Sequence, residues 1–144
     1  MIIAGRLDHL AIAADNTDAM VAWYGRVLGL VVQVEAGPNP PQKQKVYLIG
    51  PPGAGAKGSG GGGIQQGMMI EVMPRNDTVR HTRGSHDPGI SHAAWYVMDF
   101  DAALAHLRGN GVRFLSDVIT AVGGGRIISF EDCEGNMMQI VERK

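Results

Sequence analysis

The sequence predicts an α+β protein built from two copies of one supersecondary unit, and two observations support this prediction. Residues 7–13 and 90–97 both place a histidine at the third position and continue with apolar residues. A shift of 83 residues superimposes His9 on His92, and a helical pattern follows each copy. A repeat this long in a chain of 144 residues indicates two related modules that share a plan of strands and one helix.

The composition of the chain excludes several classes of function. The chain is 44% hydrophobic and 19% charged, which is typical of a globular protein. Its net charge of −1 argues against a nucleic-acid binder. The single cysteine, Cys133, excludes an internal disulfide and suits a reducing compartment. No apolar run approaches the roughly 18 residues of a membrane span, and the first residues lack a signal peptide's apolar stretch. We therefore expect a cytoplasmic protein.

The first module is assigned to residues 1–74. Residues 7–13 alternate in the manner of a strand, and Asn16 or Thr17 can cap the helix that follows. The apolar stripe of that helix comprises Met20, Trp23, Tyr24, Val27 and Leu28. Gly29 ends the helix, and residues 31–35, 45–49 and 68–73 are predicted strands. The glycine-rich stretch near 50–67 is interpreted as a mobile insertion.

A linker at residues 75–88 leads to the second module, residues 89–144. Asp99 caps its predicted helix, whose apolar stripe comprises Phe100, Ala103, Leu104 and Leu107. Gly111 is expected to end that helix, and residues 112–115, 126–131 and 137–142 are predicted strands. The linker carries three arginines and two histidines, which we interpret as a solvated segment. The alternative is a holder for an anionic substrate tail.

Four polar residues occupy equivalent strand positions in the two modules. Alternation puts them on the strand faces that do not pack on the helices; they are His9, Glu71, His92 and Gln139. If the modules pair about a pseudo-twofold axis, all four project into one apolar concavity. Unpaired polar groups there would cost several kcal/mol, and a divalent metal would satisfy all of them. Imidazole, carboxylate and amide donors suit Zn, Ni, Co, Mn or Fe, and the alternative is hydrogen-bonded histidines without metal.

Several motifs then resemble one family. They are the sequences at residues 7–12, 23–30, 89–92, 123–126 and 130–136. Together they resemble the vicinal oxygen chelate superfamily, which includes glyoxalase I, extradiol dioxygenases and bleomycin-resistance proteins. The resemblance implies a half-open barrel-like sheet around a cleft, commonly in a homodimer. It also implies metal ligands at His9, Glu71, His92 and Gln139, although most metal-dependent members carry Glu at the position of Gln139.

The resemblance implies a glyoxalase-like lyase or isomerase that acts on a small-molecule substrate. Such an enzyme abstracts a proton next to a carbonyl and stabilises a metal-chelated enediolate, with Glu71 as the base. A second proton-transferring group would have to be Tyr96 or His81. Two alternatives stay open: a non-haem iron dioxygenase, and a non-catalytic drug or metabolite binding (resistance) protein. Asp8 is expected to point away from His9, because neighbouring strand residues face opposite sides.

Overall fold

The computed structural model describes residues 7–38, 43–53 and 68–144. The chain divides into two compact units, Met1–Thr78 and Val79–Lys144, and each is described by itself. The division falls inside the expected linker, while the finer boundaries 1–74, 75–88 and 89–144 stay a prediction. Most of the predicted glycine-rich insertion lies outside the described residues. Of the helices in the described ranges, none is long and apolar enough to cross a membrane.

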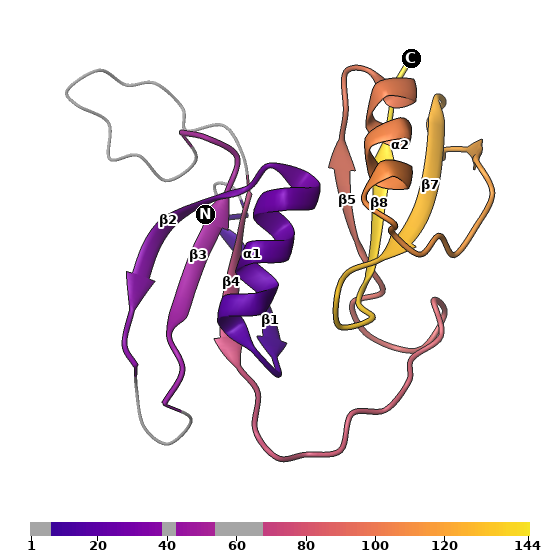
Figure 1. Cartoon of the computed structure of the whole chain (residues 1–144). Helices are drawn as coiled ribbons and strands as arrows, with labels where there is room; N and C mark the ends of the chain where they lie inside the picture. The colour runs from indigo at the N-terminus through magenta and orange to yellow at the C-terminus, as the bar shows by residue number, and fades with distance from the viewer. Residues whose placement is uncertain (1–6, 39–42, 54–67) are drawn as a thin grey trace, which may run out of the picture. The chain divides into compact units, whose positions relative to one another are not determined.

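The first unit contains one helix and a four-stranded sheet (Figure 1). Its elements in chain order are β1 (His9–Ala14), α1 (Thr17–Leu28), β2 (Val31–Ala36), β3 (Val46–Gly50) and β4 (Met69–Pro74). The strand order is β1-β4-β3-β2, in which β1 runs parallel to β4 and the other pairs are antiparallel. The first and last strands of the module are therefore neighbours, which brings His9 and Glu71 to adjacent strands.

Helix α1 covers one face of this sheet. The Asn16 side chain accepts a hydrogen bond from the Ala19 N–H at 2.9 Å, which satisfies one of the unpaired donors at the helix start. Gly29 adopts the left-handed conformation at φ 69° that ends the helix, as predicted. Apolar residues of α1, β1, β3 and β4 are buried together; they include Met20, Tyr24, Val27, Ile12, Ile49, Ile70 and Val72. Strand alternation leaves His9 and Glu71 on the opposite, open face.

The second unit repeats this plan. Its elements are β5 (Ala93–Tyr96), α2 (Phe100–Gly109), β6 (Ile119–Thr120), β7 (Arg126–Glu131) and β8 (Met137–Val141). The strand order is β5-β8-β7-β6, with β5 parallel to β8. Asp99 caps α2 by accepting the Ala102 N–H at 2.9 Å, as predicted. The buried core comprises Phe100, Leu104, Leu107, Ile128, Phe130, Met138 and Ile140.

An ion-pair network ties α2 to the end of β8. The Arg126 guanidinium donates to Glu142 through Nε at 2.8 Å and to Asp101 through Nη1 at 2.8 Å. It also lies 4.7 Å from the centre of the Phe100 ring, within the range of a cation–π contact. These hydrogen bonds, that to Glu142 first, raise the pKa of Arg126, and Arg126 in turn lowers the pKa of Glu142. Glu142 is therefore a structural ion-pair partner of Arg126.

Gly111 ends helix α2 as predicted, whereas one predicted strand of the second unit is wrong. Asn110 is the C-cap of α2, and Gly111 follows it in the left-handed region at φ 67°, with its N–H donating to the Arg108 carbonyl at 3.0 Å. The predicted strand at residues 112–115 is reduced to one bridge between Phe114 and Phe130. The ladder is interrupted because the Ser129 N–H donates to the Ser116 hydroxyl at 3.0 Å instead of to a backbone carbonyl. Pairing with β7 resumes only at β6.

The repeat extends to the pairing register. Ala11 lies opposite Glu71 in the first unit, and Ala94 lies opposite Gln139 in the second. The α+β class with two βαβββ modules is therefore confirmed, and neither four-stranded sheet closes on itself. Equivalent registers put Glu71 and Gln139 at equivalent positions on the open faces.

Candidate functional site

The side chains of His9 and Glu71 are in direct contact on the open face of the first sheet. His9 is the first residue of β1, and Glu71 lies in β4 opposite Ala11. The distance between His9 Nε2 and Glu71 Oε2 is 3.1 Å. Their side chains are 39% and 29% exposed, so the pair is accessible to a ligand while partly shielded from solvent. The structure thus brings together the two site residues that the sequence predicted in this module.

Asp8 holds the other nitrogen of the same imidazole, and here the sequence-based expectation was wrong. Asp8 Oδ2 lies 2.8 Å from His9 Nδ1. Asp8 precedes the first residue of β1, so strand alternation does not fix the direction of its side chain. This hydrogen bond is the main reason that the pKa of His9 is raised; desolvation opposes it, and the charge of Glu71 adds to it. The contact with Asp8 engages Nδ1, and Nε2 is the nitrogen that faces Glu71.

A pocket of about 240 Å³ adjoins this triad of Asp8, His9 and Glu71. Its other walls are apolar and come from β2 and β3; they are Val34, Ala36, Val46 and Leu48. Leu48 lies opposite Glu71 in the β3–β4 ladder, and Val34 lies opposite Leu48 in the β2–β3 ladder. Sequence reasoning missed these wall residues, although the strand order that positions them follows from the repeated module. A small polar centre beside apolar walls is typical of small-molecule sites.

In the second module, the two predicted site residues are each held by a serine. His92 precedes β5, and its Nδ1 lies 2.9 Å from the Ser91 hydroxyl, which donates to the Ser85 carbonyl. Gln139 lies in β8, and its Nε2 donates to the buried Ser129 hydroxyl at 3.0 Å. Because the amide nitrogen is engaged by Ser129, the amide oxygen is the atom that Gln139 offers to a ligand.

The donors of the first module fit a divalent metal. Two ligands bound at about 2.0–2.1 Å with tetrahedral angles stand roughly 3.4 Å apart, close to the 3.1 Å between His9 Nε2 and Glu71 Oε2. The Asp8–His9 hydrogen bond is the carboxylate–histidine arrangement that supports metal-bound imidazoles. Within residues 7–38, 43–53 and 68–144, no group of three or more His, Cys, Asp or Glu side chains is arranged so that it could hold a metal ion. The set that adds His92 and Gln139 stays a prediction.

Two further sequence candidates have exposed positions. Tyr96 is 64% exposed and lies on the same face of β5 as Ala94. His81 lies in the segment that precedes β5 and lines a second pocket, which belongs to the second unit alone. The linker residues 76–88 are exposed, as expected of a solvated segment, and residues 80–83 also line this pocket. Glu131 lines the same pocket and pairs with Arg113.

The fold and the polar open faces define a class of protein made of repeated βαβββ modules. A profile of the Glyoxalase/Bleomycin resistance protein/Dioxygenase superfamily matches residues 6–140, and the chain belongs to this superfamily. This membership confirms the family expected from the motifs of the sequence. No curated protein matches the chain.

Solved structures share the fold over nearly the whole chain. A glyoxalase/dioxygenase from Nostoc punctiforme is 18% identical with a TM-score of 0.70, over 100% of this chain and 97% of that one. The glyoxalase family protein from Enterococcus faecalis is 20% identical with a TM-score of 0.67, over 98% and 100%. TioX from Micromonospora sp. ML1 is 16% identical with a TM-score of 0.60, over 98% and 97%. At these identities the likeness establishes the fold.

Proposed function

We propose that this protein is a metal-dependent lyase or isomerase of the glyoxalase type, which abstracts a proton from a carbon next to a carbonyl. The observation that carries the proposal is the contact between His9 and Glu71 beside an apolar-walled pocket. A carboxylate at such a place can accept a proton from a bound substrate. Superfamily membership agrees with a small-molecule substrate.

We further propose that His9, Glu71, His92 and Gln139 are the ligands of one divalent ion, Zn, Ni, Co, Mn or Fe. Support comes from the repeat: each module places a histidine at the start of its first strand or directly before it, and a polar residue on its last strand. The matching registers of Ala11 with Glu71 and of Ala94 with Gln139 add to it. Nitrogen and oxygen donors of this kind suit those metals.

The roles of the residues follow from their chemistry. When bound, the metal would supply Lewis-acid stabilisation of the negative charge that develops on the substrate oxygens. Glu71 takes the proton, and Asp8 keeps His9 in the tautomer whose Nε2 faces Glu71. Gln139 is neutral and cannot accept that proton, so one base carries the transfer.

The test is proton exchange at carbon, which requires no knowledge of the natural substrate. The metal-loaded protein is incubated in D₂O with a panel of 2-oxoaldehyde–thiol adducts and 2-hydroxy ketones, and deuterium incorporation is followed by NMR. We expect exchange with at least one compound, and none with Glu71→Gln. Glu35→Gln is the matched control, because Glu35 lies on β2 of the same sheet and pairs with Lys45.

Metal content measured by elemental mass spectrometry accompanies this assay. We expect about one metal per chain in the wild type and a loss of metal in His9→Ala. An active Glu71→Gln enzyme would contradict the assignment of the base. An absence of exchange across the panel, with metal bound, would contradict the reaction class.

The set of proposed metal-ligating side chains also favours one alternative reaction. His9, His92 and Glu71 are the two histidines and one carboxylate found in non-haem iron oxygenases. Iron as the bound metal, together with oxygen uptake on a catechol, would move the assignment to a dioxygenase. Saturable ligand binding without turnover would instead support the non-catalytic resistance-protein alternative, which the apolar pocket walls also suit.

We also propose that the protein acts as a homodimer in the cytoplasm. Each sheet has its first strand, β1 or β5, at one edge, and sheet edges offer backbone groups for pairing. Cys133 is the single cysteine of the chain and is exposed, which suits a reducing compartment. Light scattering of the purified protein measures the oligomeric state directly, and a monomer at all concentrations would contradict the dimer.

A further inference from the structure

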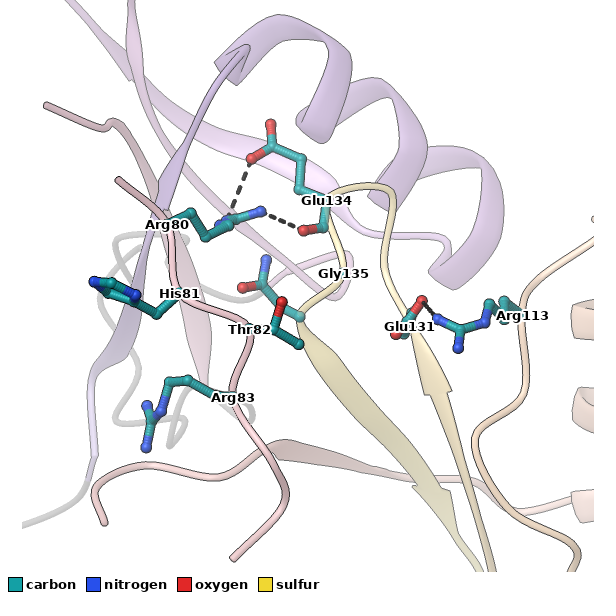
Figure 2. Close-up of a pocket in the computed structure, with 9 residues that line it drawn as sticks. Arg80, His81, Thr82, Arg83, Arg113, Glu131, Glu134 and Gly135 are labelled. Atoms are coloured by element: carbon teal, nitrogen blue, oxygen red, sulfur yellow. Dashed lines mark hydrogen bonds and ion pairs between the residues drawn. The ribbon is translucent and has the colours of Figure 1, made fainter. Parts of the chain in front are cut away.

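A second pocket, of about 480 Å³, lies entirely within the second unit. One wall is the segment 80–83 that precedes β5, and the other is the tip of the β7–β8 hairpin at residues 134–136, with Arg113 and Glu131 on the far side (Figure 2). Its volume is in the range of pockets that bind small organic molecules. We call it the linker pocket; it shares no residue with the pocket beside His9 and Glu71.

The charge of the linker pocket is positive. Arg80, Arg83 and Arg113 line it, against the two carboxylates of Glu131 and Glu134. Arg80 pairs with Glu134 at 3.5 Å, and Arg113 pairs with Glu131. Among the described residues no carboxylate pairs with Arg83, whose guanidinium donates only to backbone carbonyls. One cationic charge is therefore left without a partner, in a chain whose net charge is −1.

Both walls are held in place by hydrogen bonds. Arg83 Nη2 donates to the Pro88 carbonyl at 2.7 Å and Nη1 donates to the Ile90 carbonyl at 3.2 Å, which fixes the linker wall. In the hairpin wall, the buried Asp132 carboxylate accepts the N–H groups of Glu134 and Asn136, each at 2.9 Å. A cavity with fixed walls loses little conformational entropy when a ligand binds.

Two of the arginines keep donors for a ligand. Arg113 contacts Glu131 through Nη1, and Arg80 contacts Glu134 through Nη1 and Nη2. A guanidinium has five N–H donors in a planar fork, so each retains donors that match a carboxylate or phosphate. Thr82 extends toward the hairpin between them (Figure 2), and its hydroxyl can donate to or accept from a ligand hydroxyl. The wall chemistry thus combines anion and hydroxyl recognition.

We propose that the linker pocket binds a small hydroxylated organic anion, whose carboxylate or phosphate group is held by the arginines that line the pocket and whose hydroxyl groups contact Thr82. This site is separate from the proposed metal and its base. It gives the arginine-rich linker a ligand-binding role.

The experiment measures binding to the metal-free protein by isothermal titration calorimetry at low ionic strength. The probes are glucose 6-phosphate, gluconate and inorganic phosphate, with glucose as the neutral comparison. We expect saturable binding of glucose 6-phosphate or gluconate that weakens with added salt, tighter than that of inorganic phosphate, and no binding of glucose. Because no turnover is read, failure of this proposal and failure of the proposed reaction are distinguishable.

Two pocket variants and one control locate the binding. Arg80→Gln and Arg113→Gln should each weaken binding by about tenfold or more, because each removes a charge-assisted contact. The Arg113 side chain is 71% exposed, so its replacement should leave the fold intact even if Arg80→Gln does not fold. Arg108→Gln removes the same charge from the exposed last turn of α2 and should leave binding unchanged. Binding that is absent for every anion, or equally weakened by Arg108→Gln, would overturn the proposal.

Discussion

Gly125 provides a quantitative test of the second unit, because it packs directly on the backbone of the chain end. A Cβ built on Gly125 would lie 1.9 Å from the Glu142 carbonyl oxygen and 2.7 Å from its carbonyl carbon. Real Cβ contacts do not fall below 3.0 Å, so Gly125→Ala forces β7 and the segment after β8 apart by about an ångström. Gly125 also has φ 87°, which side-chain-bearing residues rarely adopt.

The expected cost combines two contributions. The left-handed conformation costs an alanine about 1–2 kcal/mol. Displacement of Gly125 also weakens two hydrogen bonds at this point, from Glu142 N–H to the Arg126 carbonyl at 2.9 Å and from Ala121 N–H to the Gly125 carbonyl itself at 3.1 Å. At about 0.5–1.5 kcal/mol for each bond, Gly125→Ala should lower the free energy of unfolding by about 2–5 kcal/mol in total.

Gly124→Ala is the matched control in the same turn. Gly124 has φ 92°, and nothing lies within 4 Å of its built Cβ. Gly124→Ala should therefore lower the free energy of unfolding only by the cost of the left-handed conformation, about 1–2 kcal/mol. Urea denaturation followed by tryptophan fluorescence measures both, in a Trp23→Phe background where Trp95 alone reports on the second unit. The steric reasoning is refuted if Gly125→Ala is no less stable than Gly124→Ala.

The remaining predictions concern Asp8 and the Arg126 network. Asp8→Ala should weaken metal binding by about 10–100-fold, because His9 loses the partner that fixes its tautomer; competition with a chelator measures this, and unchanged affinity would contradict the orienting role. Arg126→Gln should destabilise the protein at neutral pH. Because Arg126 lowers the pKa of Glu142 below its ordinary 4.5, this contribution is present above pH 4.5 and disappears as the pH falls through the lowered value. Denaturation at several pH values should therefore show wild type and Arg126→Gln converging in acid, and a constant difference would argue against the Glu142 pair.

Much of the fold could be predicted because it depends on local patterns. Asn16 and Asp99 were predicted as possible helix caps, and both accept the expected backbone N–H. Gly29 was predicted to end α1 and does so in the left-handed conformation. Strand alternation separated the helix-packed faces from the open faces, so His9 and Glu71 could be assigned to one face before their contact was known. Caps, breakers and two-residue periodicity act over a few neighbouring residues, and the sequence displays them directly.

Other features depend on which segments meet. The strand at residues 112–115 was predicted from its composition, yet Ser116 accepts the N–H of Ser129, a residue 13 positions away, and interrupts the ladder. Asp8 was assigned to the wrong side because a residue just outside a strand is positioned by its partners. The linker is exposed, as expected, but its charge pattern alone does not reveal that residues 80–83 line a pocket with the β7–β8 hairpin.

The sequence by itself determined the repeated βαβββ plan, the superfamily and the polar residues of the open faces. These follow from periodicity and from motifs that are local in the chain. Only the tertiary structure decided that Asp8 and Glu71 engage the two nitrogens of one imidazole and that Ser129 orients Gln139. It also decided that Arg80 and Arg113 line one pocket. Such contacts join residues distant in sequence or free to rotate, so they are fixed by pairing register and side-chain packing.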